Sequence, residues 1–416
     1  MTAVSALRDV VIIGAGPAGA ATAARLHQQG VKDVLVLDRY DFPRDKPCGG
    51  GLTGHIDRAL AALDLSLTVP FVPSPAARVR FGSFERTVRM ERAVQVIRRV
   101  DFDASLVAQI RARGVEVQTG DGVDALSVEA DAVTLALASG RTLRARVVVG
   151  ADGAASIVRK HLTGNAKALP HRLFMQELAV AHRDDAMVYD FTPMVDGLRG
   201  YLWLFPVAGG RTNVGLMHYP SSRKGGPELL RVLRARLADH GVELPGKGAR
   251  GWPVWGYHPS APVAAARLVT VGDAAGIDGL TGEGIAVALE QALIAGDHVA
   301  RALAGGDLGF RGYRRALRRE VVGRELALDR WLARLLYQAG PGWQRWLGLV
   351  LFDPDVLEMY AARVDGTEVL ADQKLRLWRA LARHTLHARD RRRQLEAAVA
   401  MRELMPAQVS SPSASS

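Results

Sequence analysis

The stretch DVVIIGAGPAGAATAARL at residues 9–26 decides the fold. Its apolar start predicts a buried strand, Gly14, Gly16 and Gly19 follow at the GxGxxG spacing, and an alanine-rich helix begins at once. The first glycine permits a tight turn, the second lets a pyrophosphate approach the backbone, and the third lets the helix pack closely on the strand. Asp38 ends the next apolar run, about 20 residues further on, where a carboxylate binds ribose hydroxyls. The sequence therefore predicts a dinucleotide-binding domain.

The composition limits the partners of the chain. Its 416 residues carry a net charge of +11, which suits an anionic partner and equally suits an arginine-rich composition with no special role. No basic run alternates with aromatic residues, so we expect no nucleic acid. Cys48 is the single cysteine. An internal disulfide is therefore excluded, and no metal site is expected.

The expected location is cytoplasmic. The first predicted strand begins so close to residue 1 that no signal peptide is expected. No apolar run reaches the ~20 residues that a membrane-spanning helix needs. Contact with a membrane surface stays open, because tryptophans are frequent in the helical stretch at residues 331–352.

The order of the predicted elements favours an α/β fold with a Rossmann-like dinucleotide-binding domain, an antiparallel-sheet domain for the substrate and a C-terminal helical region. The first domain is expected to be discontinuous, at residues 1–75, 97–165 and 263–305. The substrate domain is expected at 76–96 and 166–262, the helical region at 306–405, and a disordered tail rich in serine and proline at 406–416.

Four dispersed segments need a common explanation. These are GAGPAG with Asp38, PCGGG at 47–51, GADG at 150–153 and GDAAG at 272–276. Each follows a predicted strand or precedes a helix, and in an open parallel sheet such ends converge on the ligand crevice. Any one of them alone is best explained as a plain turn. Their joint order indicates one shared site.

This order resembles the flavoprotein family of aromatic hydroxylases, flavin-dependent halogenases and geranylgeranyl reductases, with a fold like that of p-hydroxybenzoate hydroxylase. The resemblance implies FAD as the cofactor and places Asp273 on its ribitol chain. It also places Arg99, in the RVDFD segment, near the cofactor, and Asp152 in a DG element.

Within this superfamily, DKPCGGG at 45–51, YLWLFPVAGGRTNVG at 201–215 and TGEGI at 281–285 look like the geranylgeranyl reductase branch. The glycines of TGEGI open a long predicted helix, whose positive end suits the N1 and C2 carbonyl edge of a reduced flavin. One departure is GIDGL at 276–280, where many members of the branch have no carboxylate. Asp278 therefore bears on the substrate.

The residues expected to bind FAD come from all of these segments. They are Gly14, Gly16, Ala18, Gly19, Asp38, Arg39, Cys48, Gly49, Arg99, Val123, Asp152, Gly272, Asp273, Gly282, Glu283, Gly284 and Ile285.

The substrate is expected to lie against Tyr201, Trp203 and Phe205, which alternation places on one face of a strand, and near Asp278. Without the family motif, ordinary core packing would be the better explanation of three aromatics on one face. Cys48 and Tyr201 are the candidate catalytic residues. Cys48 is either a small packing residue or a proton relay, and His55 is a further candidate donor that also fits a surface position.

Three functions stay open at this point. The first is an FAD-dependent reductase of carbon–carbon double bonds in a prenyl or polyene-like substrate from lipid or secondary metabolism, with hydride from the reduced flavin N5. The second is a flavin monooxygenase or oxidase acting on an aromatic or polyketide-type metabolite. The third is a binding protein like the Rab escort family. No second GxGxxG follows a strand, so the electron donor is NAD(P)H bound transiently or a redox protein. The oligomeric state is open.

Overall fold

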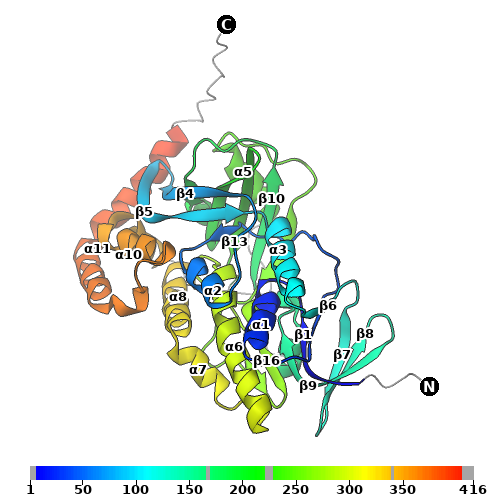
Figure 1. The fold of residues 1–416 in the computed structure, drawn as a ribbon. Coiled ribbons are helices and arrows are strands. Elements are labelled where there is room, and N and C mark those ends of the chain that lie inside the picture. Colours follow the sequence, from blue (N-terminus) through cyan, green and yellow to red (C-terminus); the bar gives the residue numbers. More distant parts are fainter. Residues whose placement is uncertain (1–5, 165–168, 221–227, 339–341, 405–416) are drawn as a thin grey trace.

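The computed structural model describes residues 6–164, 169–220, 228–338 and 342–404. The predicted tail at 406–416 lies outside these ranges. The chain forms two eight-stranded sheets with helices around them (Figure 1). Within the described ranges, no helix is both long enough and apolar enough to cross a membrane.

In the first sheet, β1 (Leu7–Ile13), the strand before GAGPAG, pairs in parallel with β2 (Val34–Leu37) and β9 (Thr142–Gly150). The path of this sheet is β15 (Ala264–Ala265), β16 (Leu268–Thr270), β9, β1, β2 and β6 (Glu116–Gln118). The hairpin of β7 (Val123–Val128) and β8 (Val133–Leu137) adds antiparallel to β9. Val10 and Ile12 face one core cluster, whereas Val11 and Ile13 face another. The run is apolar throughout because both of its faces are buried.

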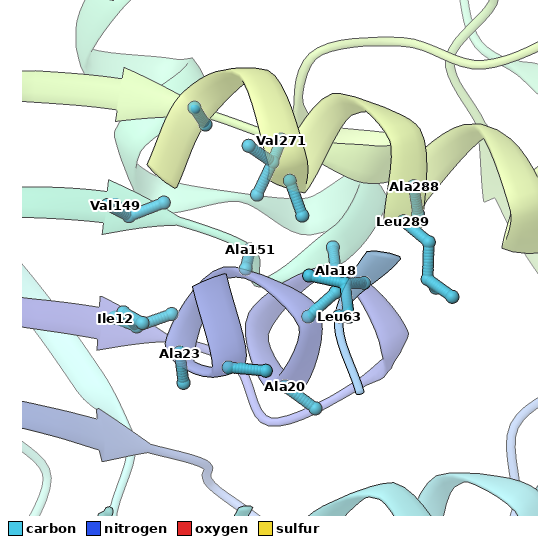
Figure 2. Packing of buried hydrophobic residues seen from close by; sticks show 14 of the residues in the cluster. Ile12, Ala18, Ala20, Ala23, Leu63, Val149, Ala151, Val271, Ala288 and Leu289 are labelled. Carbon is cyan, nitrogen blue, oxygen red and sulfur yellow. The ribbon is translucent and has the colours of Figure 1, made fainter. Parts of the chain in front are cut away.

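Helices α1 (Pro17–Gln28), α3 (Arg99–Ala112) and α6 (Ile285–Gly305) cover one face of this sheet. Figure 2 shows Ala18 of α1 and Ala288 of α6 among the side chains between these two helices. A Cβ atom on Gly272 would lie 2.8 Å from the Cβ of Ala18 and 3.4 Å from that of Ala288. Small residues at these positions therefore let two helices and the turn after β16 meet in one place.

The second sheet is antiparallel except where β11 pairs with β4. Its order is β14 (Arg250–Val254), β10 (His171–Leu178), β13 (Arg211–His218), β12 (Gly200–Val207), β11 (Met187–Asp190), β4 (Phe71–Phe81), β5 (Phe84–Ile97) and β3 (Gly51–Leu52). Helix α5 (Leu229–Ala238) packs on Leu202 and Leu204, on one face of β12. The opposite face of β12 carries the aromatic residues.

The predicted domain boundaries stay a prediction. Strand β4 starts at Phe71, ahead of the expected boundary at residue 76, and it belongs to the second sheet over its whole length. Along the chain, strands of the first sheet alternate with strands of the second, so each sheet is built from segments that are far apart in the sequence.

The remaining helices lie on the C-terminal side or fill short connections. They are α2 (His55–Ala62), α4 (Ile157–Thr163), α7 (Tyr313–Arg319), α8 (Val321–Gln338), α9 (Trp343–Phe352), α10 (Pro354–Val364) and α11 (Lys374–Leu404), with single 3₁₀ turns at Gly153–Ala155, Thr192–Asp196, Gly272–Ala274 and Leu370–Asp372. In Figure 1, α10 and α11 lie together beside β4 and β5.

Candidate active site

A cavity of about 930 Å³ lies between the two sheets, and the dispersed segments line it together. Its size is in the range of cofactor and ligand sites. The sequence-predicted residues in its lining are Gly14, Gly16, Ala18, Asp38, Arg39, Cys48, Gly49, Arg99, Val123, Asp152, Tyr201, Trp203, Phe205, Gly272, Asp273, Gly282, Glu283, Gly284 and Ile285. Gly19 and Asp278 do not line it.

The turn after β1 forms one end of the cavity, where the sequence predicts the nucleotide. Gly14 has a φ of +101°, and a Cβ there would lie 2.4 Å from the carbonyl oxygen of Ala151. A Cβ on Gly19 would lie 1.8 Å from the carbonyl oxygen of Gly14, so this glycine serves the packing of α1 and not the cavity. Asp38 accepts a hydrogen bond from the Ala15 N–H at 2.8 Å. The acid thus holds the turn in place while it lines the cavity.

Arg44 is a cation at this end that no sequence motif indicated. Its guanidinium lies 3.4 Å from the carboxylate of Asp103, and its buried Nε has no hydrogen-bond partner among the described residues. A Cβ on Gly16 would lie 3.2 Å from the Arg44 guanidinium. Asp38 is a second carboxylate near this guanidinium, with 3.9 Å between its oxygen and the Arg44 Nε. A guanidinium with a buried N–H still free to donate, beside bare glycine backbone, matches a pyrophosphate, so the residues fit the nucleotide half of FAD. Its position in a loop gave no motif by which it could be found.

Arg99, which lines the cavity, forms a buried ion pair. Its Nε and terminal nitrogen donate to the two oxygens of Asp103 at 2.7 and 2.8 Å. Burial by itself lowers the pKa of Arg99, but the Asp103 carboxylate and the Cys48 thiol outweigh it and raise the pKa overall. A permanent positive charge therefore stands beside the single thiol of the chain.

The segment after β16 supplies the other edge of the cavity. Asp273 lies 3.5 Å from the ammonium group of Lys46, and both residues line the cavity. The buried side chain of Gln291 accepts from the Gly272 N–H at 2.7 Å and donates to the Gly276 carbonyl at 3.0 Å. Gln291, which the sequence analysis did not single out, therefore fixes the GDAAG turn to α6.

Strand β12 forms an aromatic wall, defined here as Tyr201, Trp203 and Phe205. Trp203 donates its indole N–H to Asn213 at 2.8 Å, and Asn213 donates to the backbone carbonyl of Cys48 at 2.8 Å. A Cβ on Gly49 would lie 2.9 Å from the Phe205 ring. The aromatic wall and the PCGGG loop are therefore braced against each other across a polar bridge.

The two candidate catalytic side chains differ in how freely they can act. The Tyr201 hydroxyl donates to the backbone carbonyl of Thr281, and burial raises its pKa well above the ordinary value. Cys48 is half-buried, and its sulfur accepts from the Gly50 N–H at 3.4 Å. The Cys48 thiol donates no hydrogen bond to another described side chain or backbone group, whereas the Tyr201 hydroxyl already donates one.

Asp278 is placed away from the expected substrate. Its fully buried carboxylate accepts from the N–H groups of Leu280 and Thr281 at 2.5 and 2.9 Å and from the Thr281 hydroxyl at 2.6 Å. The side chain shapes the turn before TGEGI. His55 is buried and not at the surface; its Nε2 lies 3.0 Å from the Arg363 carbonyl oxygen, outside the cavity lining.

The C-terminal helices close the cavity, which the sequence did not reveal. Tyr360 and Val364 of α10 line it, and the Tyr360 hydroxyl lies 2.8 Å from the Thr281 hydroxyl.

The neighbouring Arg363 forms a buried network of ion pairs. Its guanidinium lies 3.3 Å from Glu283, 2.7 Å from Glu325 and 2.5 Å from Asp329. Glu283 also accepts from Thr53. Its carboxylate therefore joins the closing helices to the glycine turn before α6.

Comparisons with known proteins agree with this geometry. A family model described as an FAD binding domain matches residues 8–307. A menaquinone reductase of Mycobacterium tuberculosis (strain ATCC 25618 / H37Rv) is 32% identical over 324 residues, which span 70% of this chain and 76% of that protein. A digeranylgeranylglycerophospholipid reductase 2 of Methanococcoides burtonii is 26% identical and spans 72% of this chain and 76% of that protein.

Among solved structures, a geranylgeranyl bacteriochlorophyll reductase-like protein of Thermoplasma acidophilum has a TM-score of 0.69 at 20% identity, over 94% of this chain and 99% of that chain. This likeness supports the fold. The predicted α/β fold and the FAD cofactor are confirmed. The chain is an FAD-dependent oxidoreductase that belongs to the geranylgeranyl reductase family.

Proposed function

We propose that the enzyme reduces a carbon–carbon double bond in an apolar prenyl or polyene-like substrate. The observation that carries the proposal is the aromatic wall, which lines the same cavity as the FAD segments and is braced to the loop that bears Cys48. Such a wall offers a long apolar chain a surface to lie on. Relatives named for a menaquinone and for a digeranylgeranyl lipid support this substrate class.

Each part of the cavity has one task in this proposal. Bound FAD, once reduced, supplies the hydride. Arg44 and the glycine turn after β1 bind its pyrophosphate, Asp38 its ribose and Asp273 its ribitol chain. The aromatic wall orients the substrate and, with Tyr360 of the closing helices, excludes water.

Protonation of the second alkene carbon is assigned to Cys48. The thiol gives its proton to the carbon that does not receive the hydride and regains one from solvent. Arg99 beside it stabilises the transient thiolate. Tyr201, whose hydroxyl is held by Thr281, acts as a positioning residue in the wall.

The enzyme also needs a source of electrons and access to its lipid substrate. Reduction of the flavin falls to NAD(P)H or to a redox protein that binds transiently. A cytoplasmic enzyme that acts on a membrane lipid needs contact with the membrane surface.

An anaerobic assay tests the reaction. The purified flavoprotein is photoreduced without oxygen and mixed with a detergent-dispersed geranylgeranyl lipid, and flavin absorbance is followed. The proposal expects reoxidation together with a product two mass units heavier. Reoxidation only after air is admitted, with an oxygenated product, would instead establish a monooxygenase.

Two variants test the thiol in the same assay. Cys48→Ala is expected to slow reoxidation by the lipid at least tenfold, while Cys48→Ser, which keeps a small proton-bearing side chain, retains part of the rate. An unchanged rate in Cys48→Ala would leave Cys48 as a packing residue. Reoxidation by oxygen serves as the control, because that reaction needs no proton delivered to an alkene carbon.

A further inference from the structure

The outward face of α11 leaves large apolar side chains in solvent. Leu375 is 75% exposed, Trp378 is 66% exposed and Leu386 is 82% exposed. The spacing of these three residues places them along one side of the helix, with Ala382 between them. The opposite side is core, where Leu377 and others are buried. Exposed apolar rows of this kind mark interaction sites on soluble domains.

Unpaired basic side chains accompany this apolar row. Arg379, Arg389 and Arg393 share its side of the helix and are exposed, and Lys374 is exposed at its beginning. Within the described residues, none of these four side chains forms an ion pair; the ion pairs of α11 involve other arginines. We name the seven residues together the α11 face: Lys374, Leu375, Trp378, Arg379, Leu386, Arg389 and Arg393.

The arginines on the inner side of α11 show the contrast. Arg383 and Arg391 both donate to the buried carboxylate of Asp353, at 3.0 and 3.2 Å. The N–H of Ser83 donates to the Ala398 carbonyl at 2.9 Å and ties the far end of α11 to the turn between β4 and β5. The helix is therefore fixed at several points and cannot roll to bury its apolar row.

The tryptophans of the 331–352 stretch, by contrast, are mostly used inside the protein. Trp343 lies edge-on to Phe81, with ring centroids 6.1 Å apart, and Trp346 lies against His384 at 6.2 Å. Both are packed on the core. Trp331 is the exception in this stretch, at 40% exposed. Exposed apolar side chains lie closest together on the α11 face, so we place the membrane contact there.

We propose that the α11 face docks on an anionic lipid bilayer. An amphipathic helix that carries tryptophan and leucine beside lysine and arginine lies in the interfacial plane, with its apolar side chains among the acyl chains and its cations at the lipid phosphates. The exposed cations of the face complement a negative surface. A protein partner or a second copy of the chain would need an acidic counterpart to them.

The face lies one helix away from the cavity. Leu377 and Leu381 of α11 pack with Met359 and Tyr360 of α10, and Tyr360 lines the cavity. Docking would therefore bring α10, which lines one side of the cavity, near the bilayer. The inference deepens the proposed function and rests on it for the identity of the lipid cargo, whereas the docking surface stands on the geometry of α11.

Co-sedimentation with vesicles tests the docking without any substrate. The full-length flavoprotein is expected to bind vesicles of phosphatidylcholine with 30% phosphatidylglycerol and to bind pure phosphatidylcholine far more weakly. The variant Leu375→Ser/Trp378→Ser/Leu386→Ser should bind at least tenfold more weakly. All three side chains are exposed, so flavin content and thermal unfolding should match those of the wild type.

Charge variants separate this face from general electrostatics. Arg379→Gln/Arg389→Gln/Arg393→Gln is expected to lose most of the binding. The matched control Arg311→Gln/Arg315→Gln/Arg319→Gln removes the same charge from another exposed basic cluster, at α7, and should bind as the wild type does. Equal loss in both charge variants would overturn the proposal, as would a wild type that ignores anionic vesicles. Lipid-free dimers that the serine variant abolishes would assign the face to a second copy.

Failure of the docking and failure of the reaction give different results. If the docking is wrong but the reaction is right, reduced enzyme is still reoxidised by detergent-dispersed lipid and does not sediment with vesicles. If the reaction is wrong but the docking is right, the enzyme sediments with anionic vesicles and no prenyl lipid reoxidises it. In the supported case the serine variant keeps its rate on detergent-dispersed lipid and loses it on lipid in vesicles.

Discussion

The two walls of the cavity are built in opposite ways. The wall at the turn after β1 presents backbone atoms to the cavity, because Gly14 and Gly16 have no side chain and Asp38 hydrogen-bonds to the turn itself. The aromatic wall presents side chains from alternate residues of β12, on the face of the strand that lines the cavity. A site made of backbone requires particular residues at fixed spacing, whereas a site made of rings tolerates many combinations. The first kind therefore leaves a strong signature in the sequence, and the second a weak one.

Removing Arg363 is the strongest way to disturb both walls, because its network joins the closing helices to the turn before α6. Arg363→Met leaves Glu283, Glu325 and Asp329 buried without their cation. We expect the free energy of unfolding to fall by about 3–5 kcal/mol, measured by chemical denaturation. Arg324→Met, which breaks an exposed pair with Asp372, should cost under about 1 kcal/mol. Equal losses would show that the buried network has no special weight.

Gly16→Val tests the backbone wall alone. The backbone of Gly16 is in an ordinary conformation, with a φ of −69°, so the fold should persist. The new side chain would occupy the space beside Arg44 that we assign to the pyrophosphate. We expect FAD affinity to fall about 100-fold, roughly 2.7 kcal/mol, measured by flavin fluorescence titration. Gly246→Val, at a site with open space around it, should bind FAD normally. Full affinity in Gly16→Val would place the pyrophosphate elsewhere.

A pH series tests the sheet behind the aromatic wall. Burial, with Arg172 and Arg199 nearby, lowers the pKa of His218 to about 4, and its Nδ1 accepts from the Arg199 N–H at 3.1 Å. The unfolded chain therefore binds a proton at higher pH than the folded chain does. The stability from neutral His218 is present above about pH 6.5 and is lost as the pH falls toward 4.

Denaturation at pH 7 and pH 5 measures this loss. Allowing for partial solvent screening, we expect His218 to contribute up to about 1 kcal/mol per pH unit to the fall in stability. In His218→Gln the dependence on pH should be shallower by that amount. It should not vanish, because burial also lowers the pKa of His171 and of His384 to about 4. An unchanged pH dependence would contradict the assignment.

The smallest effect is expected from Tyr201→Phe. The change removes one hydrogen bond to the Thr281 carbonyl and keeps the ring in the wall, so unfolding should become easier by about 1 kcal/mol. Reoxidation of the reduced flavin by lipid should stay within about threefold of wild type. Tyr189→Phe is the control, since the only hydrogen-bond partner of its hydroxyl among the described residues is the Met187 sulfur, at 3.9 Å. A complete block in Tyr201→Phe would restore Tyr201 as the proton donor.

The same contrast explains what the sequence could predict. Gly14, Gly16 and Asp38 lie within one strand-turn-helix-strand unit, where local spacing determines geometry. Asp273 and Cys48 became predictable through family motifs, and the structure brings both to the cavity.

The missed residues depend on contacts that no local pattern encodes. Arg44 lies in an irregular loop, and Arg363 meets its carboxylates only after the C-terminal helices have folded back onto the turn before α6. Asp278 was expected at the substrate because it departs from the family pattern. The direction of a carboxylate in a turn is set by neighbouring N–H groups, and those of Leu280 and Thr281 hold it inward.

Strand β16 of the first sheet and helix α6, which packs on α1, come late in the sequence, and this affects folding during synthesis. Strand β1 lies beside β2 and β9, but α1 needs α6 to cover its alanine-rich surface, and α6 ends at Gly305. A ribosome adds about 5–20 residues per second. Strand β1 and helix α1 thus emerge from the ribosome first, and the apolar surface of α1 stays exposed to solvent for tens of seconds until α6 has been synthesised. A truncated product that stops in the second sheet would never cover that surface, and we expect chaperones and proteases to recognise it.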